Sequence, residues 1–403
     1  MNSPIYVQSK TKSNYPFNLM IFNGLFLMLN VNQILSIIFL SSGNDNIIRI
    51  SNYLFYIIGV FLAIVSILTN KKDFKSKIFL VGMLFLAIID WMIYGLNLAI
   101  FTNYLNFYLM MTIWIVSDTI KISKKNFNMF AISIIIQSFV LIVVYFSPRA
   151  YFSYQEYVKV SSTLTLGFSN PNETGIILFS TIVPLTFLNK TNKNKIFNVI
   201  ISIIIVILIY FLILTDARTS MVCCFLFLFL VKMTQRLNIR NTNTIKLIVL
   251  LCLLMPCFFV LFYIRLSNIV NVNDIVFIGK KLISGRQRVY EKTFLDWNNI
   301  FFGNMQTLLF SNSHNGFLTI LANNGLICFV LYMIYIYDKL VSIELIFLKK
   351  QKKSIGIIAI FMIFIMASTE SSVLVGGTIF YYYTFIFCYI YNYELKFNNL
   401  GNK

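Results

Sequence analysis

The chain has 403 residues, of which 58% are hydrophobic and only 12% are charged, and its formal net charge is +19 at pH 7. Apolar runs of about the length needed to cross a ~30 Å hydrocarbon layer recur from end to end, which indicates an all-α polytopic integral membrane protein. The basic residues lie in short clusters between these runs, as in the cytoplasmic loops of membrane proteins, so no nucleic-acid partner is expected.

Twelve membrane-spanning helices are predicted in a single membrane domain, residues 1–403. The first apolar run is about 24 residues long and lacks a small-residue cleavage site, so we expect it to be retained as a span. The spans are expected at residues 17–40, 53–69, 78–99, 104–120, 127–147, 172–189, 196–214, 219–233, 245–264, 316–337, 354–369 and 372–391.

The orientation follows from the basic clusters, which fall on every second loop. They include Lys71-Lys72, Lys124-Lys125, Lys190 to Lys195 and Lys349 to Lys353, and the predicted cytoplasmic segments together hold 23 of the 33 Lys and Arg residues. Since Lys and Arg accumulate on the cytoplasmic side of a membrane, we expect both termini in the cytoplasm.

Cysteines are expected to have no chemical role. All six fall inside apolar runs. They have neither the spacing of disulfides in an external loop nor the His and Cys partners of a zinc site. We expect no metal and no other cofactor.

Two external segments are long: residues 148–171, and residues 265–315 between the ninth and tenth spans. Both contain Tyr, Phe and Trp at a density that disordered segments lack, so we expect both to fold onto the outer face. Phe294, Trp297 and residues 300–302 are expected to form the apolar side of a short interfacial helix. The alternative is a plain solvent loop.

Polar residues inside apolar spans need an explanation, because they are costly there. Asn23, Asn30 and Gln33 share one face of the first span, where hydrogen bonds between helices account for them. Asp90, next to Trp91, has no positive residue within one turn. It is expected to be protonated or paired with an arginine from the external side, in either a structural or a functional role.

Four external motifs contain the candidate site residues. In residues 167–175, Asn170-Pro171 predicts a turn, and Asn172 or Thr174 is the expected cap of the following helix. Arg218 lies in a very short hairpin at the outer surface, where it either lines a cavity mouth or reaches lipid phosphate.

The other two motifs lie in the long loop. Arg286 and Arg288 follow two lysines, and an arginine fork matches phosphate oxygens with two hydrogen bonds. His314, the one histidine of the chain, stands beside Asn315 where a span begins. With an unperturbed pKa of about 6.5 it is a candidate general base, and the alternative is a cap or an interfacial residue.

In order along about 160 residues, these motifs resemble the O-antigen ligase and polymerase superfamily of bacterial envelope proteins. The matching segments are residues 167–175 with Glu173, 216–220, 284–286, 302–304 and 314–326. The resemblance implies action on undecaprenyl-diphosphate-linked glycans at the outer face of the plasma membrane, without a metal or a nucleotide sugar.

Residue by residue, the resemblance assigns Arg218 and Arg286 to the diphosphate and His314 to catalysis. We expect Asn172, Glu173 and Asn315 to bind substrate with them. The spacing from Arg286 or Arg288 to Gly303 is looser than in family polymerases, which leaves open which of these two arginines holds the diphosphate.

Three functions from different classes remain. The first is a polymerase that joins lipid-linked repeat units into a capsular or surface polysaccharide, with membrane lipids, a flippase and a chain-length regulator as further partners. The second is a ligase that transfers finished glycan to a lipid core or a protein. The third is a flippase, which is disfavoured because Asp90 is the one charged residue expected at depth and no internal repeat is seen.

The topology is testable by cysteine labelling. With a membrane-impermeant thiol reagent added from outside, Asn312→Cys outside the tenth span should be labelled and Phe74→Cys should not, because the basic clusters put position 74 in the cytoplasm. The unsubstituted protein is the control, because it shows how far the native cysteines are labelled. Strong labelling at position 74 with none at 312 would overturn the orientation.

Overall fold

A computed structural model covers the chain and describes only part of it. The described residues are 31, 34, 35, 37, 38, 74–95, 124–147, 150–153, 162–168, 170–233, 242–269, 276–277, 280–281, 286–295, 299–303, 314–349, 354–370 and 378–397. The spans expected at 53–69 and 104–120 lie outside these residues, as do Asn23, Asn30, Gln33 and Trp297.

The described elements are helices with two very short hairpins. The helices are α3 (Phe74–Tyr94), α5 (Lys124–Tyr145), α6 (Pro171–Thr191), α7 (Lys195–Leu214), α8 (Arg218–Met233), α9 (Thr242–Ile269), α10 (Arg286–Leu295), α11 (Gly316–Lys349), α12 (Ile355–Met366) and α14 (Thr378–Phe397). The antiparallel strands are β1 (Tyr151–Ser153) with β2 (Ser162–Leu164), and β3 (Val276–Phe277) with β4 (Lys280–Lys281).

The all-α membrane class is confirmed. Among the described residues, five helices are long and apolar enough to cross a membrane, and they belong to α5, α6, α7, α9 and α11. Two helices extend past the spans predicted for them: α9 continues to Ile269 and α11 to Lys349. The start predicted for the last span, residue 372, lies outside the described residues. Apolar runs locate the part of a helix in hydrocarbon, whereas the helix itself continues into polar sequence.

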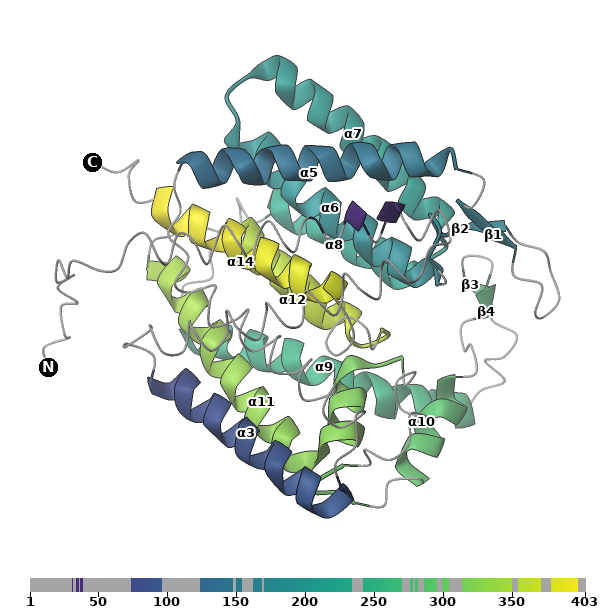
Figure 1. Ribbon diagram of the computed structural model, residues 1–403, viewed down its shortest axis with the longest axis vertical. Coiled ribbons are helices and arrows are strands. Elements are labelled where there is room, and N and C mark those ends of the chain that lie inside the picture. The colour runs from purple at the N-terminus through teal and green to yellow at the C-terminus, as the bar shows by residue number, and fades with distance from the viewer. Residues whose placement is uncertain are drawn as a thin grey trace, which may run out of the picture.

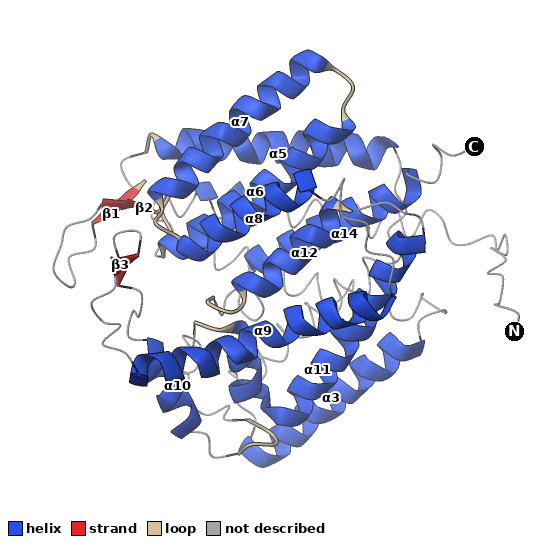
Figure 2. Ribbon diagram, turned by 180° about the vertical axis from the view of Figure 1, so that it is seen from behind, coloured by secondary structure: helices blue, strands red, loops and turns tan. Residues whose placement is uncertain are grey.

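The two ends of the bundle differ. Figures 1 and 2 show both hairpins and α10 at one end of the helices, and the connection between α6 and α7 at the opposite end. That connection includes Lys193, which was predicted to be cytoplasmic, whereas the hairpins and α10 belong to the two predicted external loops. The arrangement therefore agrees with the predicted alternation of these segments.

The short helix of the long external loop is not where it was expected. α10 ends at Leu295, and Ile300 and Phe301 lie in a turn beyond it. Phe294, Ile300 and Phe301 are all exposed, but they do not form one helical face. Propensity explains the shift, because the run after Arg286 has good helix formers, whereas two asparagines at 298 and 299 favour a turn.

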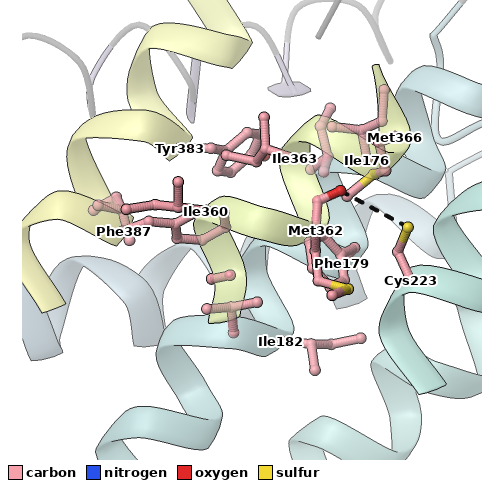
Figure 3. Close-up of a cluster of buried hydrophobic side chains, with 14 of the residues drawn as sticks. Ile176, Phe179, Ile182, Cys223, Ile360, Met362, Ile363, Met366, Tyr383 and Phe387 are labelled. Atoms are coloured by element: carbon pink, nitrogen blue, oxygen red, sulfur yellow. Dashed lines mark hydrogen bonds between the residues drawn. The ribbon is translucent and has the colours of Figure 1, made fainter. Parts of the chain in front are cut away.

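The core beneath the hairpin end is formed by α6, α8, α12 and α14. Figure 3 shows Phe179, Ile363 and Phe387 packed together in this cluster, and the Cys223 thiol donates to the carbonyl oxygen of Met362 at 3.8 Å. A side chain at Gly175 would overlap Ala217 and Ser220, so this glycine lets α6 lie close to α8. The close approach brings the start of α6 to the hairpin that carries Arg218.

Two glycines join the external loop to α11. Gly303 and Gly325 both have positive φ angles, of 81° and 78°. The N–H of Leu326 donates to the carbonyl oxygen of Ile300 at 2.9 Å, and the Tyr94 hydroxyl donates to that of Gly303 at 2.6 Å. A side chain at either glycine would overlap backbone of the other segment, so the two motifs pack backbone against backbone.

Gly325→Ala should destabilise the fold. With φ 78° and ψ 174° this residue occupies a region open almost only to glycine, and its new methyl group would overlap Phe301; the expected cost is on the order of 1–3 kcal/mol. The measurement is the melting temperature of the purified protein in detergent. Gly82→Ala on α3 is the matched control, because nothing lies within 4 Å of the added carbon and melting should be unchanged or slightly higher. Equal melting of the two variants would show that the contact is not needed.

Candidate functional site

The segment that follows α12 holds the candidate site together. Beyond Met366 the chain makes a turn from 367 to 369, and three successive backbone carbonyl oxygens there accept hydrogen bonds from other elements. The pairs are Ala367 with the Gly316 N–H at 2.8 Å, Ser368 with the Asn315 amide at 3.0 Å, and Thr369 with Arg286 Nη1 at 3.0 Å.

Glu370 continues this set of contacts with its side chain. Its Oε1 accepts from Asn172 Nδ2 at 2.8 Å and lies 3.4 Å from Arg286 Nη2, and its side chain is only 8% exposed. The Thr369 hydroxyl donates to that of Thr219 at 2.7 Å. Residues 367–370, hereafter the α12 junction, thus contact the starts of α6, α8, α10 and α11.

Arg218 and Arg286 lie close enough to affect each other. Arg218, half-buried at the first position of α8, has a pKa lowered by burial and then by the positive charge of Arg286. Asp216, held with φ 52° in the turn before α8, acts in the opposite direction on that pKa. Two guanidinium groups at the rim of a low-dielectric region form a site suited to an anion of more than one charge.

Arg288 is placed differently. Two residues along a helix correspond to a rotation of about 200°, so Arg286 and Arg288 point to opposite faces of α10. Arg288 is exposed, whereas Arg286 contacts the α12 junction and has a side chain that is 20% exposed. The structure therefore brings Arg286 to Arg218 and leaves Arg288 outside the cluster.

His314 belongs to the cluster of Arg218 and Arg286. Its φ of 51° is uncommon for a residue other than glycine and costs roughly 1–2 kcal/mol. Burial, followed by the charge of Arg286, lowers the pKa of His314 to about 4. The expectation of an ordinary imidazole pKa is therefore wrong, and this side chain is neutral throughout the physiological pH range.

Asn315 is used as a structural residue. It is fully buried; its Nδ2 donates to the carbonyl oxygens of Pro256 and Ser368, both at 3.0 Å, and its Oδ1 accepts from the Leu318 N–H at 2.9 Å. Both amide protons are taken by backbone of α9 and of the α12 junction. Asn315 thus caps α11 and positions its neighbour His314, and its role in substrate binding stays a prediction.

The start of α6 also departs from expectation. The helix cap is Asn170, whose side chain accepts from the Asn172 N–H, and not Asn172 or Thr174. Thr174 donates to the carbonyl oxygen of Thr165 at 2.5 Å. Asn172 is therefore free of a capping role, and its side-chain amide reaches Glu370.

Two carboxylates accompany the arginines. Burial raises the pKa of Glu370 to about 7 against the charge and hydrogen bond of Arg286, which lower it, and Glu173 raises it further. Glu173 thus lies near Glu370, as part of the same cluster. Asp90, by contrast, is buried on α3 with Tyr94 and Cys328 as electrostatic neighbours.

Sequence reasoning missed Glu370, which contacts Arg286 and Asn172 in the structure. The available signal was a charged residue in the short turn expected between two apolar spans, residues 354–369 and 372–391. Tyr290, one turn beyond Arg286, was also missed: it is fully buried, and burial raises its pKa to about 12, so its hydroxyl stays protonated.

Comparisons with known proteins do not place the chain. No family model matches it, and no curated protein and no solved structure matches it. What the fold defines is a class: an all-α membrane protein with a polar cluster at the hairpin end of its helices.

The chain's single histidine allows the His314 pKa to be measured directly. In protein labelled with ¹⁵N-histidine, the one imidazole signal should titrate near pH 4, because burial and Arg286 both disfavour the charged form. Since the unfolded chain binds this proton at about pH 6.5, stability should fall as the pH drops from there toward 4. Arg286→Gln should raise the midpoint, and a midpoint of 6–7 in the parent protein would contradict the buried environment.

Proposed function

We propose that the protein is a glycosyltransferase that joins undecaprenyl-diphosphate-linked oligosaccharide repeat units into a capsular or surface polysaccharide. The reaction would take place at the outer face of the bacterial plasma membrane, with both termini in the cytoplasm. The observation that carries the proposal is the clustering of Arg218, Arg286 and His314 at one end of the helix bundle. The same three residues are those that the superfamily resemblance assigns to the site.

The arginines supply what the leaving group requires. The hydroxyl oxygen of the acceptor sugar attacks the anomeric carbon of the donor, and the bond from that carbon to the diphosphate breaks. The electron pair leaves with the diphosphate, whose negative charge increases. Fixed guanidinium groups stabilise charge that develops in the transition state, and Arg286 is already fixed by the carbonyl oxygen of Thr369.

His314 supplies the base. Its neutral imidazole can accept the proton of the attacking hydroxyl, and attack opposite the leaving group inverts the anomeric centre. A pKa of about 4 keeps the side chain neutral but makes it a weak base. A bound diphosphate offsets the charge of Arg286, which is one cause of the low value, so donor binding should raise the pKa of His314 toward the working pH.

Two other functions make different demands on this site. A ligase would use the same residues and chemistry with a lipid core or a protein as acceptor, and it is the alternative. A flippase requires polar groups along a path through both leaflets. The groups used here gather at one end of the bundle, which favours an enzyme.

The test is polymerisation by purified variants in vesicles with synthetic lipid-linked repeat units. Arg218→Lys and Arg286→Lys should lose most activity, because lysine keeps the charge and loses the two-pronged hydrogen bonding. His314→Ala should lower the rate on the order of 10²- to 10⁴-fold and build no chain beyond the single unit. Arg288→Lys is the matched control and should remain active, since its side chain is exposed on the far face of α10.

The outcomes separate the assignments. Full activity of both arginine variants would mean that they are general lipid-surface charges. Glu173→Gln tests whether this carboxylate, and not His314, takes the proton: if this variant fails while His314→Ala polymerises normally, the base is not the histidine. Transfer of a preformed polymer to a lipid core, without chain growth, would favour the ligase.

A further inference from the structure

Arg286 uses its two terminal nitrogens for different purposes. Nη1 donates to the backbone carbonyl oxygen of Thr369 at 3.0 Å, whereas Nη2 lies 3.4 Å from the Glu370 carboxylate. The first contact anchors the guanidinium to the α12 junction. The contact of Nη2 with the carboxylate is longer than that of Nη1 with the carbonyl oxygen. Nη2 can therefore exchange one anionic partner for another while Nη1 keeps its hydrogen bond.

Glu370 therefore occupies the position that an incoming anion would take. We propose that Glu370 is a resident counter-anion of Arg286, that the diphosphate of the donor displaces it, and that the displaced carboxylate takes up one proton from solvent. This inference rests on the proposed function and extends it, because it makes donor binding depend on proton concentration. The step balances: one carboxylate and one proton become one carboxylic acid, and the diphosphate keeps its charges.

The surroundings of Glu370 favour that proton. On α6, Glu173 adds a second negative charge and Asn172 donates to Oε1. On α10, Arg286 supplies the positive charge, and Tyr290 is a further titratable neighbour, whose hydroxyl stays protonated. Arg218 and His314 face Arg286 from the starts of α8 and α11. Once Arg286 turns to a diphosphate, Glu370 is left nearly buried beside Glu173 and a new anion, which all disfavour its charged form.

Asn172 keeps the displaced carboxyl group in place. Its amide donates to Oε1 at 2.8 Å, and an amide can hydrogen-bond an acid as well as a carboxylate. The loss of Arg286 therefore leaves Glu370 with a partner in both protonation states. This makes the exchange reversible without movement of a helix.

The predicted consequence is a pH-dependent affinity. Burial raises the pKa of Glu370 to about 7 in the free protein, and the bound diphosphate should raise it further. The contribution of Glu370 to the dissociation constant should be constant below neutral pH and should rise about tenfold per pH unit above it, until the complex itself loses the proton. A diphosphate esterified at both ends does not titrate near neutral pH, so it adds no slope of its own.

The experiment is isothermal titration calorimetry on the full chain in detergent, with farnesyl diphosphoryl N-acetylglucosamine as the probe and no acceptor. At pH 8, measurements in two buffers of different ionisation enthalpy should show uptake of close to one proton per probe bound. Glu370→Gln should abolish the uptake at pH 8 and bind the probe with the same affinity from pH 7.5 to pH 8.5, where His314 stays largely neutral. Glu291→Gln, a carboxylate of α10 outside the contacts described above, should behave as the parent.

A neighbouring variant gives a directional check. Glu173→Gln removes a charge that raises the pKa of Glu370, so proton uptake should begin at lower pH than in the parent protein. Thermal melting establishes that each variant is folded. Unchanged uptake in folded Glu370→Gln protein would overturn the inference and leave the proposed function standing.

Failure of the proposed function has a different signature. If the parent protein does not bind the probe at any pH, the diphosphate site itself is wrong, and the inference falls with it. Binding by the parent with no proton uptake at pH 8 would count against the role of Glu370 alone. At pH 8 His314 stays largely neutral even when a bound diphosphate raises its pKa from about 4, so uptake at that pH reports on Glu370.

Discussion

A backbone carbonyl group near the end of a membrane helix must be hydrogen-bonded, because little water reaches it there. In this protein that requirement falls on the α12 junction, where the carbonyl oxygens of Ala367, Ser368 and Thr369 accept from residues of α10 and the start of α11. Those donors are the side chains and backbone on which the candidate site is built. Satisfying the end of one helix therefore also fixes Arg286 and the segment that carries His314.

Close backbone packing explains the glycines around the site. Gly175 allows residues 217–220, at the start of α8, to pack against α6, and Gly303 and Gly325 let two backbone segments touch. Without a hydrophobic driving force between helices in lipid, close backbone approach and hydrogen bonds provide the attraction. A glycine in the middle of a motif thus has a packing reason here, which is independent of any contact with substrate.

Local signals predicted the parts of this structure that are local. Charge clusters and apolar runs placed α6, α7 and α8 within a residue or two, and the hairpin of Arg218 was expected on the outer side. Asn172 and Glu370 are 198 residues apart in the sequence, and no periodicity or motif predicts their contact. The low pKa of His314 was equally unpredictable, because it depends on burial and on Arg286 from another helix.

The charges of the site make sense as a set. Two guanidinium groups at the rim of a low-dielectric region would repel each other and would be costly to hold without anions nearby. Glu370 lies beside Arg286, with Glu173 near it, so these carboxylates bring the cluster closer to neutral when they are ionised. A neutral cluster is easier to fold, but each resident carboxylate also opposes a negatively charged donor. One protonatable carboxylate reconciles the two demands, since it is charged when the arginines need a partner and neutral when a diphosphate takes that place.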